Sequence, residues 1–113
     1  MRINEQKLDE VLLDLGHDDF NWGTAHIREA VKLFEPGMLM TKELYPAIAK
    51  AHHGSPARIE RRMRHALEKA WSRGSGEARL KYFGFSNSPE PGRPTVGEYV
   101  ARLARLCRDE VQP

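Results

Sequence analysis

The chain has 113 residues and a mass of 12.9 kDa, with 40% hydrophobic and 30% charged residues. This balance is typical of one soluble globular domain and not of a disordered chain. No apolar run approaches the roughly 18 residues of a membrane-spanning helix, so we expect no membrane partner. The chain begins directly with a charged helical pattern and has no apolar h-region, so we also expect no signal peptide. A single cysteine, Cys107, excludes a disulfide framework and a cysteine zinc cage, which favours a reducing, cytoplasmic location.

The net charge of +2 conceals an uneven distribution along the chain. Residues 1–40 carry four basic and eight acidic side chains, whereas residues 58–81 carry eight basic and three acidic ones. A concentrated basic block on an otherwise acidic chain indicates one face that binds a polyanion.

Helical periodicity predicts three helices in the first half of the chain. Their expected ranges are 4–15, about 24–35 and roughly 41–52. Asn4 fits an N-cap and Gly16 a helix stop. Proline breaks a helical hydrogen bond unless it lies in the first turn, so Pro46 leaves the start of the third helix open between Thr41 and Tyr45.

The second half predicts three more helices, separated by glycine and by a loop over residues 86–94. Their expected ranges are 56–72, 77–83 and 95–111. Ser55 is an N-cap followed by proline, and Thr95 with Glu98 forms a capping box. No segment shows strand alternation, so we predict a single compact all-α domain of about six helices.

Helix 56–72 has two different faces. Ile59, Met63, Leu67 and Trp71 form one apolar stripe that predicts the core. The opposite face is rich in arginine, and the helix follows helix 41–52 across a short turn at residues 52–55. A basic second helix after such a turn is a helix-turn-helix pattern, here over about 41–73. An ordinary solvated helix face is the alternative interpretation.

Several segments carry a family resemblance. They are 44–50 (LYPAIAK), 58–61 (RIER), 64–66 (RHA) and 70–74 (AWSRG), with further matches at 27–30, 83–84, 94–95 and 98–99. From about Val11 to Leu106, the chain resembles the C-terminal DNA-binding domains of the stage 0 sporulation A response regulators. The resemblance implies a winged-helix-like effector, a transcriptional regulator that reads a short G/C-containing box in double-stranded DNA at the nucleoid.

The resemblance also implies site residues. By motif position, Glu60, Arg61 and Arg64 match the base-contacting positions, where arginine can bind guanine and glutamate the cytosine amino group. Contacts to the DNA backbone or groove edge are expected from Ser55, Arg58, Arg62, His65, Lys69 and Arg93. Two departures stand out: the family usually has a small residue in place of Arg62, and a lysine-bearing loop where this chain has only Arg93.

The resembling proteins carry a receiver domain before this one, and 113 residues leave no room for it. We expect one effector domain over residues 1–113, either excised or stand-alone, that binds DNA without phosphorylation. It should be monomeric when free and pair in tandem on DNA. The expected protomer contacts lie on the last helix, at Arg102, Arg105, Arg108 and Glu110. The alternative is a protein-interaction module that binds RNA polymerase or another regulator.

For the other residues that could bind a metal or catalyse a reaction, we favour structural roles. The histidines show no spacing typical of a metal site, so we expect no metal and no cofactor. Asp18 and Asp19 fit a solvated turn, and Cys107 a small packing residue. Trp22 fits the core better than an interface, and Trp71 lies on the core stripe. No nucleophile–base pair or carboxylate pair is present, so we expect no enzyme.

Overall fold

The computed structural model describes residues 2–18, 20–84 and 92–109. The elements in chain order are α1 (Glu5–Asp14), α2 (Trp22–Leu33), the π-helical turn η1 (Met40–Leu44), α3 (Tyr45–Ala51), α4 (Pro56–Arg73), α5 (Gly76–Phe83) and α6 (Val96–Cys107). The described residues contain no strand, so the predicted all-α fold of six helices is confirmed. None of the described helices is both long and apolar enough to cross a membrane.

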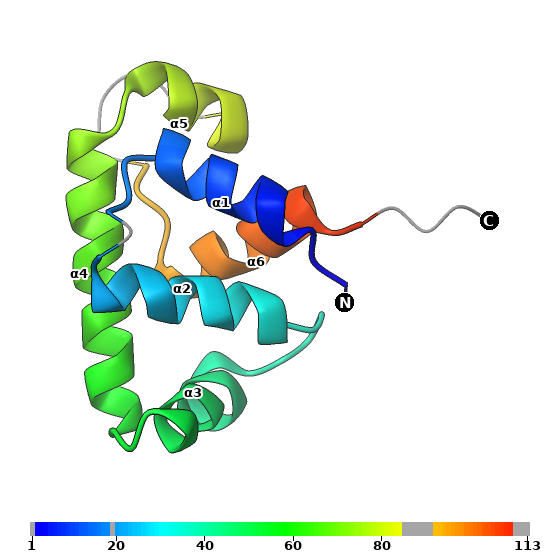
Figure 1. Ribbon diagram of the computed structural model, residues 1–113, viewed down its shortest axis with the longest axis vertical. Coiled ribbons are helices and arrows are strands. Elements are labelled where there is room, and N and C mark those ends of the chain that lie inside the picture. The colour runs from blue at the N-terminus through cyan, green and yellow to red at the C-terminus, as the bar shows by residue number, and fades with distance from the viewer. Residues whose placement is uncertain (1, 19, 85–91, 110–113) are drawn as a thin grey trace.

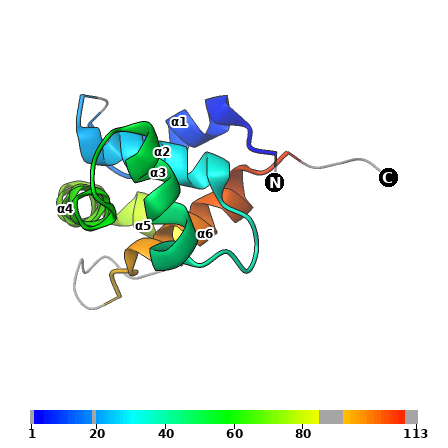
Figure 2. The ribbon, with the colours of Figure 1, turned by 90° about the horizontal axis from the view of Figure 1, so that it is seen from below.

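The longest helix, α4, lies along one edge of the molecule (Figure 1). Helices α1, α2 and α6 run from the opposite side toward α4, while α5 and α3 lie near its two ends. The second view shows α4 end-on at the same edge (Figure 2). One face of α4 is therefore left outside the helical assembly.

Capping side chains define the predicted helix starts. Asn4 Oδ1 accepts a hydrogen bond from the backbone N–H of Lys7, and Ser55 Oγ accepts one from Arg58. Thr95 and Glu98 form the predicted capping box, each accepting from the backbone N–H of the other. Such bonds satisfy donors that have no partner within the first turn of a helix.

The predicted start of the second helix was misplaced, and the open start of the third is resolved. Helix α2 begins at Trp22, because the side chain of Asn21 caps the N–H groups of Gly23 and Thr24. The segment predicted as helix 41–52 consists of η1 and α3, with Pro46 in the first turn of α3. Proline lacks the N–H that would have no intrahelical partner there.

The last helix ends at Cys107, so the predicted end at residue 111 was wrong. The backbone N–H of Asn4 donates to the Cys107 carbonyl at 2.7 Å, and that of Asp109 donates to the Arg2 carbonyl at 2.9 Å. This pairing, with a bridge between Ile3 and Arg108, holds the chain after α6 in an extended form.

Trp71 is the centre of an aromatic cluster in the core. Its side chain is 2% exposed and contacts Phe83 and Tyr99 edge-to-face, with ring centroids 5.4 and 6.4 Å apart. The predicted stripe of α4 is buried throughout. Arg79, which the sequence places in the basic block, is also buried and donates to the carbonyls of Trp71 and Gly74.

Trp22 is 65% exposed, so its predicted place in the core was wrong. Helix α2 packs on α4 through the next residue, Gly23, where an added Cβ would lie 2.1 Å from the carbonyl oxygen of Arg62. The inward row of α2 therefore begins at a glycine, and the tryptophan one position earlier lies at the rim.

We expect Trp71→Ala to lower the free energy of unfolding by about 3–5 kcal/mol, because it removes a large buried aromatic side chain. Urea denaturation measures the loss. Trp22→Ala is the matched control and should change stability by no more than about 0.5 kcal/mol, as exposed positions do. Equal losses in the two variants would contradict this packing.

His17 joins the segment after α1 to α2 and α6. The ring nitrogen Nδ1 lies 3.0 Å from Thr24 Oγ1, and Nε2 lies 2.7 Å from Tyr99 Oη. The residue is 6% exposed, and burial lowers the pKa of His17 to about 4. The charged form is disfavoured because it would lose its hydration inside the fold.

Stability should therefore fall with acidification. The unfolded chain protonates His17 near pH 6.5 and the folded chain near pH 4, so the contribution is intact above pH 6.5 and is lost as the pH falls toward 4. The expected loss from His17 is about 2 kcal/mol between pH 7 and pH 5. Urea denaturation of wild type and His17→Gln at both pH values isolates it, since burial also lowers the pKa of His26. Identical pH dependence in both chains would refute it.

Candidate nucleic-acid interface

Helices α3 and α4 and the turn between them form a helix-turn-helix within the predicted range of residues 41–73. The turn is tight because His53 adopts a left-handed backbone conformation, with φ of 54°. The N–H of Gly54 then donates back to the carbonyl of Ala49 at 3.0 Å. Ser55 caps α4 immediately afterwards, so the turn fixes the position of the first residues of α4.

The outer face of α4 carries side chains that are exposed. Among the described residues, the side chains of Arg58, Arg61 and His65 have neither an ion pair nor a hydrogen bond. The predicted core residues lie on the other side of the same helix and are buried. The outer face can thus present cationic groups to a polyanion without disturbing the core.

Arg64 differs from these arginines because it is paired along the helix. Its Nε donates to Glu60 Oε1 at 3.0 Å, and its Nη1 lies 3.7 Å from Glu68 Oε1. These carboxylates raise the pKa of Arg64, with the bond to Glu60 as the main cause. Two of the predicted base-contacting residues, Glu60 and Arg64, are therefore bound to each other.

Two predicted groove-edge residues lie on the side of α4 that faces the N-terminal half. Arg62 is half-buried, and its Nη1 donates to His26 Nε2 across 3.4 Å. Lys69 is exposed and lines a small hollow with Asp18 and Asn21, the segment between α1 and α2. Arg62 and Lys69 therefore flank the outer face and are not at its centre.

Arg93 lies beside the first part of α4. It lines a hollow of about 590 Å³ together with Glu60 and Arg64, and the other walls come from η1, the start of α3 and the start of α6. The predicted loop contact is thus placed next to two of the predicted base-contacting side chains. Residues 86–91 of the predicted loop lie outside the described residues.

A sequence model of the family described as "Sporulation initiation factor Spo0A C terminal" matches residues 8–106. The chain belongs to this family. The Spo0A C-terminal family is a family of DNA-binding domains that regulate transcription in sporulation, and it is not a family of enzymes. The match covers all of the helix-turn-helix and extends almost to the end of α6.

The arginines at and just after α6 differ in their exposure to solvent in this Spo0A-type domain. Arg102, one of the expected protomer contacts, is half-buried, and its Nε donates to the Tyr82 carbonyl at 3.0 Å. Arg105 is exposed on the helix. Arg108 is exposed just beyond it, in the bridge to Ile3. Glu110 lies outside the described residues.

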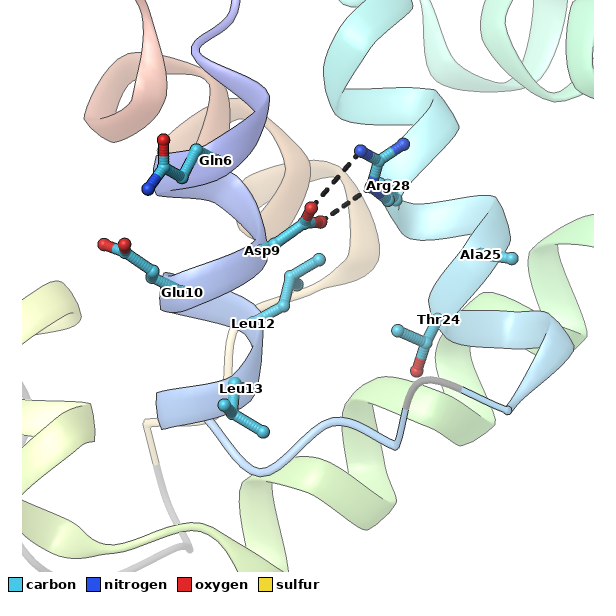
Figure 3. A pocket seen from close by; sticks show the side chains of 8 residues that line it. All are labelled: Gln6, Asp9, Glu10, Leu12, Leu13, Thr24, Ala25 and Arg28. Atoms are coloured by element: carbon cyan, nitrogen blue, oxygen red, sulfur yellow. Dashed lines mark hydrogen bonds and ion pairs between the residues drawn. The ribbon is translucent and has the colours of Figure 1, made fainter.

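The acidic side chains of α1 are partly neutralised by α2. Arg28 pairs with Asp9 at 2.7 Å and with Glu5 at 3.0 Å, and Lys32 also pairs with Glu5. Figure 3 shows Asp9 and Arg28 facing each other across the hollow between the two helices. The N-terminal end of α1 lies on the side of the molecule away from α4 (Figure 1), where it does not oppose a polyanion bound to α4.

Proposed function

We propose that the chain is a sequence-specific regulator that reads a short G/C-containing box by placing α4 in the DNA major groove. The observation that carries the proposal is the outer face of α4, with Arg58, Arg61 and His65 exposed on a helix whose other face is core. A helix of this kind fits the major groove, which admits one α-helix. Membership of a DNA-binding family supports the same function.

Individual roles follow from position and chemistry. Arg61 and Arg64 present guanidinium groups to guanine acceptors, and Glu60 accepts from a cytosine amino group. Ser55, Arg58 and His65 contact phosphates beside the first turns of α4, and Arg93 does so from the segment before α6. Arg62 and Lys69 serve the groove edge on the α2 side. The site of action is the nucleoid.

A second candidate function is binding to a protein such as RNA polymerase. The observation in its favour is the exposure of large apolar side chains near the start of α2 and the end of α1. Phe20 is 97% exposed, and Trp22 and Leu13 are exposed as well. Salt separates the two functions, because binding through phosphates weakens steeply as salt rises and binding through an apolar surface does not.

Arg61→Ala and Arg64→Ala should each weaken binding to a selected one-box duplex by about 1–3 kcal/mol, the range for an arginine that reads a base. Fluorescence anisotropy with duplexes selected from a random pool measures the change. Arg105→Ala is the matched control, since this exposed arginine lies on α6. Wild-type affinity in both α4 variants would exclude α4 as the reading helix.

The free chain should sediment as a monomer and bind two neighbouring boxes cooperatively without a phosphodonor, because one bound protomer raises the local concentration of the next. We propose Arg105 and Arg108 as the main protomer contacts, with Arg102 held back by Tyr82. Arg105→Glu should abolish cooperativity on a two-box duplex and leave one-box binding unchanged. A stable dimer without DNA would contradict this arrangement.

A further inference from the structure

We infer that His26, Glu29 and His52 form a binding site for a divalent transition-metal ion of the zinc type. One potential ligand atom from each residue lies within 4.8 Å of the other two. His26 and Glu29 are separated by three positions on α2, so both lie on one face of that helix. His52 comes from the C-terminus of α3, in the turn that precedes α4. The site would therefore join α2 to the helix-turn-helix.

The three side chains already converge without a metal. Nε2 of His52 lies 2.6 Å from Oε2 of Glu29, and the rings of His26 and His52 meet edge-to-face with centroids 4.8 Å apart. His26 is fully buried. Its Nδ1 is buried with no hydrogen-bond partner among the described residues. A buried nitrogen without a partner is rare in folded proteins and is consistent with a missing ligand.

The donor set selects the class of metal. Two imidazoles and one carboxylate suit zinc, cobalt, nickel or copper, whereas calcium and magnesium prefer oxygen donors alone. Zinc accepts three protein ligands with water in the fourth position of a tetrahedron. Donors about 2.0–2.1 Å from such a metal lie roughly 3.3 Å apart, so small side-chain rotations close the site. His52 and Glu29 can make them, since their side chains are 29% and 33% exposed.

Arg62 is the cation that opposes the metal. Its guanidinium contacts His26 Nε2, so it adds positive charge beside the site and occupies a nitrogen that could ligate. Replacing Arg62 with an uncharged side chain of similar length should therefore strengthen metal binding. If Arg62 only supported the fold at this contact, its replacement would not strengthen metal binding.

Trp22 lies beside both histidines, with its ring centroid 6.1 Å from that of His26 and 6.2 Å from that of His52. A bound paramagnetic ion such as Co²⁺ should quench its fluorescence at this distance. The other tryptophan, Trp71, lies in the aromatic cluster with Phe83 and Tyr99. The Trp22→Phe variant therefore reports whether quenching arises at the proposed site.

The test uses the untagged full chain after removal of metals by a chelator. Zn²⁺ is titrated by calorimetry, and Co²⁺ by visible absorption and tryptophan fluorescence. We expect one equivalent to bind, with quenching that Trp22→Phe abolishes. Zn²⁺ should also raise the melting temperature, because the unfolded chain lacks the assembled site.

Glu29→Gln and His52→Gln, the two less buried ligands, should each lower Zn²⁺ affinity by more than the roughly 10–100-fold that loss of an outer-shell partner costs. His53→Asn and His65→Gln are the matched controls and should bind like wild type; asparagine tolerates the left-handed backbone at residue 53. Arg62→Met should bind more tightly than wild type.

Failure of wild type to bind one equivalent of either metal would overturn the site. So would equal loss of affinity in His52→Gln and His53→Asn, because binding would then be nonspecific. None of these measurements involves DNA, so the metal site and the proposed DNA-binding function can fail independently.

Discussion

The close approach of α2 to α4 is the constraint on which the position of α4 depends. At Gly23 an added Cβ would lie 2.1 Å from the carbonyl oxygen of Arg62, so only glycine allows the two helices to pack this closely. At the C-terminal end of α4, an added Cβ on Gly74 would lie 2.6 Å from the carbonyl oxygen of Leu15. These two close approaches place the middle and the C-terminal end of α4 against the N-terminal half and leave the opposite face of the helix outside.

The same packing divides the basic block into residues with different tasks. Arg79 is inside the fold, where it donates to carbonyls at the end of α4. Arg62 is turned toward His26, and Arg64 is paired with two carboxylates. The charge count along the sequence places all of these arginines in one basic block. In the fold, fewer of them are free at the centre of the outer face of α4. Specific binding under the proposed function should therefore depend on single arginines and less on total charge.

Local signals in the sequence predicted most of the helices and the position of the turn. Capping at Asn4, Ser55 and Thr95 depends only on residues a few positions away, and it was predicted correctly. The end of α6 and the exposure of Trp22 depend on contacts with distant segments, and both predictions were wrong. The cluster of His26, Glu29 and His52 was missed for the same reason, since its members meet only after α2 and α3 have packed together.

The ion pairs along α4 affect the sequence selectivity of the proposed DNA binding. Arg64 pairs with Glu60 and Glu68, and on a guanine edge it would exchange these carboxylates for the two acceptors of the base. A wrong base pair offers no such exchange, so Arg64 stays on the carboxylates while their charge still faces the negatively charged duplex. Discrimination of this kind comes from penalties against incorrect sites as well as from contacts to the correct one. A helix face with carboxylates among its arginines thus sacrifices general affinity for polyanions and gains selectivity between sequences.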